Sequence, residues 1–436
     1  MVYPSNINLP PHHLNLASIR SGPSRHWFAF LRRLRYQLLG GVLVAVVFPA
    51  LLRTGFDFRV TGGGSLQNTV AGTFLAMVVG VYLYRRVSDF PGTSRFPYVL
   101  IAFLITYGGA IGIFFFLRWD YSRFQFLSSF LIACAWFGAA AFFEPRLRRA
   151  SLLVLPFGDA KSVTRSPRAD WKMASAPERA VGVSGIVVDL RADLPVEWDR
   201  FLVRAALDGI PVYHWKQISE SLNGTVEIEH LSENTLGSLL PSSLYLRLKR
   251  MVDCILAIAL LPFAALIAVP AALAIKYLDG GSVLFFQERM GLGGRPFMMV
   301  KFRTMRFGEE PGKLFTEVND PRITKVGGLL RRYRIDELPQ IINILRGEMS
   351  WIGPRPEAVP LAAWYESQIS FYAYRHIVRP GITGWAQVNQ GNVAEIEAAT
   401  NKLHYDFFYI KYFSPWLDVL IVAKTMWILM TGHGAR

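Results

Sequence analysis

Apolar runs long enough to cross a lipid bilayer constrain this chain more than any other feature of its sequence. A transmembrane helix needs roughly 20 predominantly apolar residues. Four runs in the first third of the chain approach or reach that length: residues 36–52, 69–84, 97–117 and 126–143. No charged residue interrupts these runs, which argues against an ion or proton pathway. We therefore expect four transmembrane helices within residues 36–145, preceded by a basic tail at residues 1–35.

Basic residues collect at the ends of this four-helix block. Arginines cluster before the first run, between the second and third, and after the fourth: Arg25, Arg32, Arg33 and Arg35; Arg85, Arg86 and Arg95; Arg146, Arg148 and Arg149. Because cytoplasmic loops are enriched in lysine and arginine, we expect both ends of the block to face the cytoplasm. The formal net charge of +15 favours anionic lipid headgroups and phosphorylated substrates as partners. The sequence has neither zinc-finger spacing nor a basic reading helix, so no nucleic-acid binding is expected.

Residues 146–245 have the pattern of a small parallel α/β module. Short apolar strands alternate with one helical stretch: strands at residues 152–157, 185–190 and 209–213, and a helix at residues 197–207. A nucleotide site would need glycines in the first strand–helix turn, and only Gly158 lies there. We therefore predict a degenerate Rossmann-like domain without a cofactor, with a role in assembly or regulation.

A fifth apolar segment, residues 248–277, is long enough to span a membrane but carries Pro262 and Pro270 in its interior. Each proline removes a backbone hydrogen bond and kinks a helix. Basic residues lie on both flanks. A spanning helix would also put the rest of the chain outside the cell, where nucleotide-activated substrates are absent. We predict a re-entrant helix that enters the cytoplasmic leaflet of the membrane and returns.

The adjacent carboxylates Asp336 and Glu337 are the main candidates for chemistry. Three arginines come shortly before them: Arg331, Arg332 and Arg334. Because aspartate is a favoured N-cap and Pro339 fits a first turn, a helix is expected to begin at Asp336. The free N–H groups and positive dipole end of a helix start suit a phosphate group. The alternative interpretation is that Asp336 only caps the helix and Glu337 lies on its first turn.

Other basic side chains stand beside stiff loops and strands. A predicted hairpin leads to Lys301 and Arg303, Arg355 lies in a Gly-Pro-Arg-Pro turn, and Arg379 opens an Arg-Pro-Gly loop. Residues 403–430 interleave aromatic residues with lysines. This mixture suits helices lying in the headgroup region of a membrane, with ordinary core packing as the alternative.

Together these motifs resemble the bacterial sugar transferase family, the monotopic phosphoglycosyl transferases that act on polyprenyl phosphate. The matching elements follow the family's order: residues 249–253, 281–285, 287–291, 301–305, 319–324, 336–340, 353–356, 379–385 and 405–409. The four-helix block and the α/β module resemble the large subclass, exemplified by undecaprenyl-phosphate galactose and glucose phosphotransferases. The family usually breaks its membrane helix at a Ser-Pro. This chain has Leu261-Pro262 and Val269-Pro270 instead, so either proline is a candidate for the break.

The resemblance implies a two-step transfer on a catalytic domain at residues 246–436. Asp336 would attack the β-phosphorus of a UDP-sugar, release UMP, and carry the sugar phosphate until undecaprenyl phosphate takes it. Mg²⁺ is the implied cofactor, with Asp336 and Glu337 as its ligands and Glu337 also as a candidate acid–base group. The remaining candidates would hold phosphate oxygens or shape the site: Lys301, Arg303, Arg331, Arg355 and Arg379.

Other functions are alternatives at this point. A metal-dependent glycosyltransferase of the nucleotide-sugar fold would show an Asp-x-Asp triplet, and the sequence contains none. A polytopic transferase would place acidic loops between many spans. A non-catalytic membrane scaffold is a third alternative, because the N-terminal half has no chemistry of its own. The subclass favours a plain hexose as the sugar. The polymer would be exopolysaccharide, capsule or O-antigen, which the sequence does not distinguish, and the α/β module suggests a homodimer.

Overall fold

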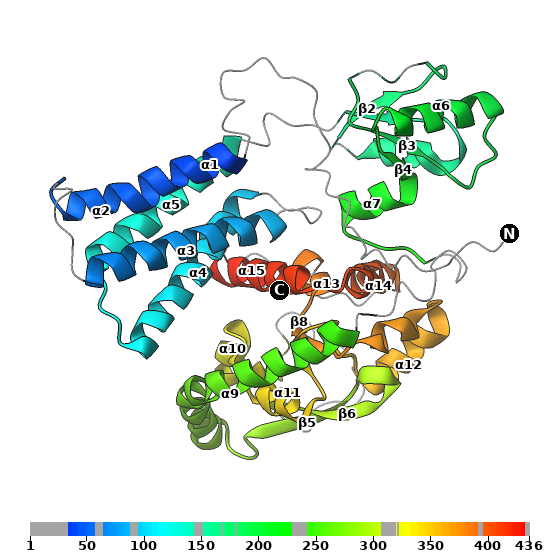
Figure 1. Ribbon diagram of the computed structural model, residues 1–436. Coiled ribbons are helices and arrows are strands. Elements are labelled where there is room, and N and C mark those ends of the chain that lie inside the picture. Colours follow the sequence, from blue (N-terminus) through cyan, green and yellow to red (C-terminus); the bar gives the residue numbers. More distant parts are fainter. Residues whose placement is uncertain are drawn as a thin grey trace. The chain divides into compact units, whose positions relative to one another are not determined.

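The computed structural model describes residues 34–56, 64–87, 95–143, 151–166, 169–178, 180, 182–228, 241, 243–306, 320, 322–390 and 396–431. The chain divides into two compact units, Met1–Gly224 and Thr225–Arg436, and each is described by itself (Figure 1). Residues 1–33 of the predicted tail lie outside the described residues. The predicted domain boundaries near residues 145 and 245 stay predictions.

The helices of the first unit coincide with the four apolar runs of the sequence. They are α1 (Leu34–Gly41), η2 (Val42–Val47) and α2 (Phe48–Arg53), which follow one another directly, then α3 (Gly64–Val87), α4 (Arg95–Leu117) and α5 (Arg123–Phe143). Within the described residues, each of these four stretches contains a segment long and apolar enough to cross a membrane. That all four do cross stays a prediction.

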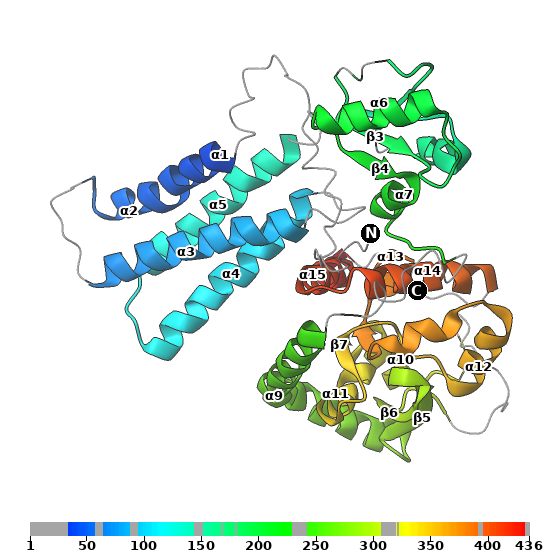
Figure 2. The same cartoon turned by 45° about the vertical axis from the view of Figure 1, so that its right-hand side comes forward.

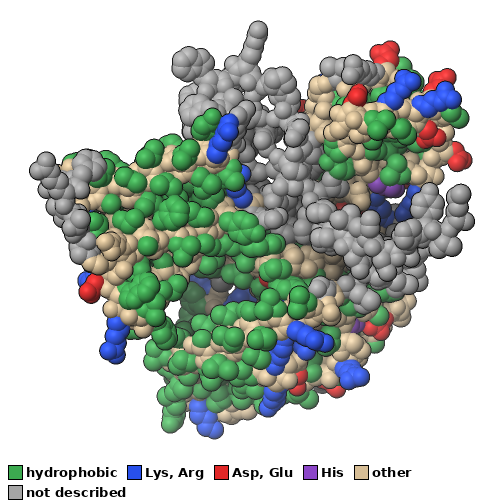
Figure 3. Space-filling model, in the orientation of Figure 1, with side chains coloured by type: hydrophobic (Ala, Val, Ile, Leu, Met, Phe, Trp, Pro, Cys, Tyr) green, Lys and Arg blue, Asp and Glu red, His purple; other side chains and the backbone are tan. Residues whose placement is uncertain are grey.

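Glycines and aromatic rings pack these helices together. Gly41 faces Phe137 and Gly80 faces Phe103 so closely that an added Cβ would lie 2.6 Å and 2.7 Å from the rings. The rings of Phe103 and Phe137 stack with their centroids 5.5 Å apart. Small residues allow membrane helices this close approach. Outward side chains such as Phe116 are also apolar, and apolar side chains cover the visible face of this bundle (Figure 3).

A parallel sheet follows the bundle in the first unit. Its strands, in the order β2–β1–β3–β4, are β1 (Ser151–Val154), β2 (Asp170–Met173), β3 (Gly185–Val188) and β4 (Val212–His214). The connecting helices are η4 (Gly158–Arg165), α6 (Val196–Leu207) and α7 (Trp215–Asn223) (Figure 2). The predicted parallel α/β sheet is confirmed. Strand β2 escapes prediction because it is a largely exposed edge strand with no apolar run. The Rossmann-like character stays a prediction. A Rossmann fold has an α-helix after its first strand, whereas here β1 is followed by the 3₁₀ helix η4.

A carboxylate occupies the carboxyl edge of this sheet between β1 and β3. Asp189 accepts hydrogen bonds of 3.1 Å from the N–H groups of Asp159 and Arg191. Gly158 has a φ of +54°, and a Cβ there would lie 2.3 Å from Asp189 Oδ2. Doubly wound folds bind phosphate groups at this kind of edge. In this chain, the turn after β1 instead binds a carboxylate of the protein itself.

The second unit is mainly helical around short strands. Its described helices are α9 (Ser243–Ala274), η5 (Ile275–Asp279), η6 (Leu292–Gly294), α10 (Lys325–Arg332), η7 (Ile335–Gln340), α11 (Ile341–Arg346), α12 (Val359–Gln368), η8 (Tyr372–Ile377), α13 (Trp385–Asn389), α14 (Ile396–Lys411) and α15 (Pro415–Thr431). Its described strands are the antiparallel hairpin β5 (Leu284–Met290) and β6 (Pro296–Phe302), and the parallel pair β7 (Ser350–Ile352) and β8 (Gly381–Thr383). The predicted hairpin before Lys301 is confirmed.

Both ends of the long apolar helix are bonded to the second unit. Near the start of α9, Lys249 Nζ lies 2.6 Å from Asp418 Oδ2 on α15. At the far end of η5, Asp279 accepts a hydrogen bond of 2.6 Å from Thr324 Oγ1 at the start of α10. The two ends of this apolar stretch therefore belong to one folded body.

Between its ends, α9 presents two different faces. One face packs on the second unit through small residues: Ala257, Ala264, Ala268 and Ala271. The remaining faces expose large apolar side chains, of which Phe263 and Leu266 are two. The helix continues through Pro262 and Pro270, which are both exposed. The segment Ser243–Asp279 is long and apolar enough to cross a membrane, and its predicted re-entrant break stays a prediction.

The aromatic residues of α14 are core residues. Phe407, Phe408 and Tyr409 are each no more than 2% exposed, and the ring of Trp385 stacks on Phe408 at 5.6 Å. The headgroup placement predicted for residues 403–430 is therefore wrong for these side chains. Core packing, the alternative for this segment, explains them, because they are buried against other parts of the second unit such as Trp385 of α13 and Asp418 of α15.

Candidate active site

The carboxylate pair lies on a 3₁₀ turn. Asp336 and Glu337 belong to η7, and the α-helix that follows begins only at Ile341. Arg334 precedes η7 with a φ of +55°, and the N–H of Glu337 bonds to the Arg334 carbonyl three residues back, at 3.3 Å. The predicted α-helix start at Asp336 is therefore wrong. Because Arg334 is left-handed, the helical hydrogen bonds begin at its carbonyl, and the first turn is a 3₁₀ helix that starts at Ile335, one residue before Asp336.

Apolar contacts hold η7 against the hairpin. Ile335 and Leu338 pack in a cluster with buried Phe302 of β6 and Leu330 of α10. Side chains alternate between the two faces of a strand. Because Phe302 points into this cluster, its neighbour Lys301 points to the other face, where the carboxylates lie.

Glu337 is buried and surrounded by cations. Its Oε1 accepts a hydrogen bond of 3.0 Å from Arg355 and lies 3.7 Å from Lys301 Nζ, and its Oε2 lies 3.9 Å from Arg334. Burial opposes ionisation of this carboxyl. The charges of Arg355, Lys301 and Arg334 outweigh burial and hold the pKa of Glu337 at about 2. Glu337 is therefore a fixed anion at neutral pH.

Asp336 has the opposite environment. It is half-buried, and within the described part of the chain its carboxylate has neither a hydrogen bond nor an ion pair. Burial and the neighbouring charge of Glu337 raise the pKa of Asp336, against the pull of Lys301, Arg331 and Arg355. Two adjacent carboxyl groups whose pKa values are pushed apart are typical of sites that assign them different chemical roles. Asp336 is the unengaged carboxylate of the pair.

Lys301 is a second perturbed group at the site. Burial and the charge of Arg355 lower the pKa of the Lys301 ammonium to about 8, although Glu337 and Asp336 favour its charged form. The site therefore combines two carboxylates with Lys301 and Arg355 within a mostly water-excluded space. Such an arrangement can hold a phosphoryl group and compensate its charge.

The other predicted phosphate-binding residues are not all at this pair. Arg331, on the last turn of α10, is near enough for its charge to favour ionisation of Asp336. Arg303 donates to the Gly280 carbonyl after η5, and Arg379 donates to the Gly347 carbonyl at 3.0 Å. Lys301 and Arg355 thus contact Glu337 of the pair directly, while Arg303 and Arg379 bond to backbone elsewhere in the unit.

Close backbone packing explains one glycine in each of two loops, Gly353 of the Gly-Pro-Arg-Pro turn and Gly381 of the Arg-Pro-Gly loop. A Cβ on Gly353 would lie 2.3 Å from the Arg379 carbonyl oxygen, and a Cβ on Gly381 would lie 2.1 Å from the Gly353 nitrogen. The parallel pairing of β7 with β8 creates this contact. The backbone of Arg379, rather than its side chain, therefore packs against the turn that carries Arg355.

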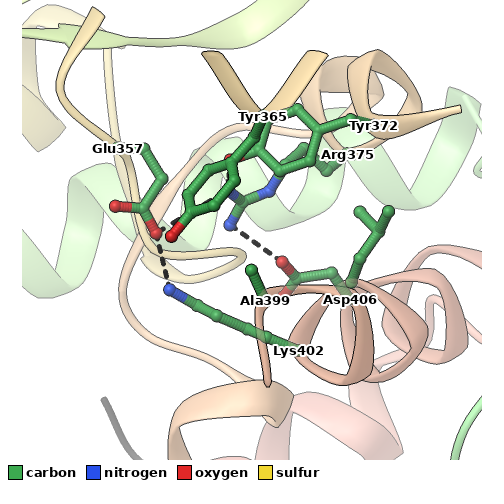
Figure 4. Close-up of a pocket in the computed structure, with 8 residues that line it drawn as sticks. Glu357, Tyr365, Tyr372, Arg375, Ala399, Lys402 and Asp406 are labelled. Carbon is green, nitrogen blue, oxygen red and sulfur yellow. Dashed lines mark hydrogen bonds and ion pairs between the residues drawn. The ribbon is translucent and has the colours of Figure 1, made fainter. Parts of the chain in front are cut away.

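A buried charged cluster lies behind this turn. Glu357 pairs with Lys402 at 2.5 Å, and Arg375 pairs with Asp406 at 2.8 Å, around a small cavity that Tyr372 also lines (Figure 4). The sequence interpretation missed this cluster. Its members lie on three separate parts of the unit: the loop after Pro356, η8 and α14. Asp406 belongs to the matching element 405–409, but only the fold brings it together with Arg375.

Arg289 on β5 is another residue that sequence reasoning left out of the site. It donates to Gln287 Oε1 at 2.7 Å and to the Pro356 carbonyl at 2.9 Å. Burial and the charge of Arg355 lower its pKa. The Gln-Glu-Arg-Met-Gly motif of the resemblance was the available signal, because it contains both Gln287 and Arg289.

The carboxylate pair also fits the ligand preferences of Mg²⁺. Glu337 Oε2 is buried and has no hydrogen-bond partner among the described residues, and Asp336 offers two more free oxygens. Over the same ranges, no group of three or more His, Cys, Asp or Glu side chains gathers that could hold a metal alone. Mg²⁺ typically binds through one or two carboxylates and completes its shell with water and substrate phosphates. The donor set agrees with that mode.

Comparison with known proteins gives matches along most of the chain. The family model described as bacterial sugar transferase matches residues 244–432. A UDP-N-acetylgalactosamine-undecaprenyl-phosphate N-acetylgalactosaminephosphotransferase of Aeromonas hydrophila is 44% identical over 402 residues, which are 91% of this chain and 94% of that protein. UDP-glucose:undecaprenyl-phosphate glucose-1-phosphate transferases of Xanthomonas campestris pv. campestris and Escherichia coli (strain K12) are each 44% identical to 41% of this chain. The matched parts are 37% and 39% of those two proteins. The chain belongs to the bacterial sugar transferase family.

Proposed function

We propose that this protein transfers a sugar 1-phosphate from a UDP-sugar to undecaprenyl phosphate, through a covalent intermediate on Asp336. The observation that carries the proposal is the contrast within the pair. Glu337 is fixed as an anion by Arg355 and Lys301, while Asp336 beside it is unengaged and faces the same cations. The names of the relatives support the class of donor and acceptor.

The first step forms a bond between a carboxylate oxygen of Asp336 and the β-phosphorus of the donor. The bond between that phosphorus and the oxygen bridging to the α-phosphorus breaks, and this oxygen leaves on UMP. In the second step, an oxygen of undecaprenyl phosphate bonds to the phosphorus and the Asp336 carboxylate leaves. Mg²⁺, when held by Asp336, Glu337 and phosphate oxygens, supplies charge neutralisation. Lys301 and Arg355 orient the phosphoryl oxygens, and Arg331 favours the ionised form of Asp336.

We further propose that the active site lies on the cytoplasmic face of the bacterial inner membrane. A helix that crossed a membrane would place its two ends on opposite sides. Lys249 and Asp279, at the two ends of the apolar stretch, bond to the same folded unit, which supports entry and return on one side. A cysteine introduced at exposed Arg295 should then react with an impermeant reagent only from the cytoplasm. Labelling from the periplasm would contradict this topology.

The sugar is the finer part of the proposal. The expected plain hexose agrees with the glucose transferases, whose similarity covers less than half of the chain. The relative that matches nearly the whole chain carries N-acetylgalactosamine in its name, so this sugar is the first to test.

A UMP-release assay tests the function directly. The purified full-length protein is incubated with undecaprenyl phosphate, Mg²⁺ and each of UDP-glucose, UDP-galactose, UDP-N-acetylglucosamine and UDP-N-acetylgalactosamine. We expect UMP with one of these donors and a diphosphate-linked lipid product. Release of UDP instead of UMP would indicate an ordinary glycosyltransferase. No turnover with any donor would favour the scaffold alternative.

A further inference from the structure

The segment that carries Arg355 is held by three separate residues behind the site. The carbonyl of Arg355 accepts a hydrogen bond of 3.0 Å from Arg375 Nη2, and the carbonyl of Pro356 accepts one of 2.9 Å from Arg289. The next carbonyl, that of Glu357, accepts one of 2.9 Å from the N–H of Met290. These three consecutive carbonyls are thus bonded to two elements, η8 through Arg375 and β5 through Arg289 and Met290.

Arg375 is itself fixed by a buried partner. The nitrogen that bonds to the Arg355 carbonyl also donates to Asp406 Oδ2 at 2.8 Å, and the other terminal nitrogen donates to Tyr372 at 2.5 Å (Figure 4). The side chains of Arg375 and Asp406 are 3% and 1% exposed. The ion pair between Lys402 and Glu357 holds the same segment at a second point.

An ion pair this deeply buried is a poor source of stability. Removing two charges from water costs several kcal/mol, and apolar replacements are often equally stable. A guanidinium, however, presents several N–H groups in one rigid plane. Arg375 uses that plane to join Asp406 on α14 to the backbone of Arg355, which an apolar side chain could not do.

We infer that Arg375, oriented by Asp406, is a positioning residue that sets the Arg355 side chain against Glu337. Proline fixes φ near −65° on both sides of Arg355, at Pro354 and Pro356. A shift of the Arg355 carbonyl is therefore passed to its side chain and to the bond of 3.0 Å with Glu337. The inference rests on the proposed function, because it treats the Arg355–Glu337 pair as part of the reacting site.

A change at Asp406, away from the carboxylate pair, should therefore alter the rate of UMP formation. Asp406 has no bond to either carboxylate of the pair within the described residues. Arg375 links it to the backbone of Arg355, whose side chain bonds to Glu337. Displacing a catalytic group by about 1 Å can cost about 100-fold in rate. The replacement Asp406→Asn keeps the volume and removes the charge that orients Arg375. We expect it to slow the chemistry while the protein stays folded.

The experiment is a rapid-quench measurement on full-length protein in detergent with radiolabelled UDP-sugar. Donor is in saturating excess and undecaprenyl phosphate is left out, so that each folded protein releases one UMP. The amplitude of this burst then reports the amount of folded protein, whereas the rate constant of the burst does not depend on it. We expect Asp406→Asn to lower the rate constant about 10- to 100-fold at nearly wild-type amplitude. The control Glu397→Gln, the same type of change at an exposed position of α14, should leave both unchanged. A lower amplitude with an unchanged rate constant would overturn the inference.

A double-mutant cycle tests whether the effect passes through Arg355. If it does, Asp406→Asn should add less than about 3-fold to the loss caused by Arg355→Ala. Losses that multiply would contradict the inference. Should Asp406→Asn fail to fold, Arg375→Lys, which keeps the charge but not the planar fork, is expected to reproduce the same rate effect. If wild-type protein releases no UMP from any donor, the proposed function itself is wrong. This result differs from a failure of the positioning role alone, in which wild-type protein is active and Asp406→Asn leaves the rate constant unchanged.

Discussion

Two aspartates of this protein show how the surroundings of a carboxylate decide its role. Asp189, in the first unit, lies at the carboxyl edge of the parallel sheet and accepts hydrogen bonds from the N–H groups of Asp159 and Arg191. Asp336, in the second unit, has no bonded partner among the described residues and faces Lys301, Arg331 and Arg355. The first carboxylate is fully engaged, and the second is available.

This difference in bonding gives the two aspartates different roles, one in the stability of the fold and the other in the reaction. An engaged carboxylate contributes to folding, because its removal leaves buried N–H groups without acceptors. An unengaged carboxylate among cations contributes little to folding and can attack an electrophile that those cations attract. Asp336 should therefore matter for the reaction and little for stability, and Asp189 the reverse.

The largest effect is expected at Asp336. Asp336→Asn removes the nucleophile and should lower UMP release by at least about 1000-fold. Because no bonded partner loses a contact, the melting temperature of the detergent-solubilised protein should stay close to that of wild type. The measurements are UMP release and thermal unfolding on the same preparation. Activity within about 10-fold of wild type would assign the nucleophile to another residue.

Glu337 is expected to show a mixed effect. Glu337→Gln removes the anion that pairs with Arg355 and Lys301, and these cations are then left without their partner. Loss of one charged group at a reaction centre typically costs about 100-fold in rate. Unlike Asp336→Asn, this change should also lower the melting temperature, because breaking a buried ion pair is destabilising. Wild-type stability would mean that the cations are not held by Glu337.

At Asp189 we expect the reverse of the Asp336 result. Asp189→Ala leaves the N–H groups of Asp159 and Arg191 without an acceptor, at a cost of about 2 kcal/mol. Amide hydrogen exchange in peptides from residues 151–223 should become about 30-fold faster, while the rate constant for UMP formation stays unchanged. A slower reaction with unchanged exchange would show that the sheet edge takes part in the chemistry.

The smallest effect is a pH dependence of the same region. Burial lowers the pKa of His214, helped by Arg191 and Lys216 and opposed by Asp189 and Glu220. The folded state therefore favours neutral imidazole. This stability is complete above the unfolded pKa, near 6.5, and is lost as the pH falls below it. The protection factors of amides in residues 151–223, which correct for the slower intrinsic exchange at lower pH, should therefore fall between pH 7 and pH 5. His214→Asn should flatten this dependence, since asparagine can still cap α7.

The sequence predicts those parts of the fold that local pattern determines. The apolar runs locate the helices of the bundle and α9, and the apolar strands locate β1, β3 and β4. Strand β2 is missed because it is a polar edge strand. The helix start expected at Asp336 is wrong because Arg334 adopts a left-handed conformation, which no local preference of arginine indicates.

The site is predictable only in part for the same reason. Asp336, Glu337, Lys301 and Arg355 stand out through adjacent charges and stiff loops, and the fold brings them together. Arg379 has an equally conspicuous loop but bonds to the Gly347 carbonyl. The partners that hold the Arg355 loop come from distant elements: Arg289, Arg375, Lys402 and Asp406. Arg289 and Asp406 lie in matching motifs, but neither motif indicates that its residue reaches this loop.

The central claim is that Asp336 carries the sugar phosphate between two half-reactions. The most direct test mixes full-length protein with labelled UDP-sugar in the absence of undecaprenyl phosphate, quenches with acid, and maps the label by mass spectrometry. We predict one adduct, on the peptide that contains Asp336, which disappears when undecaprenyl phosphate is added before the quench. Protein that releases UMP in the full reaction but never carries label on Asp336 would contradict the account.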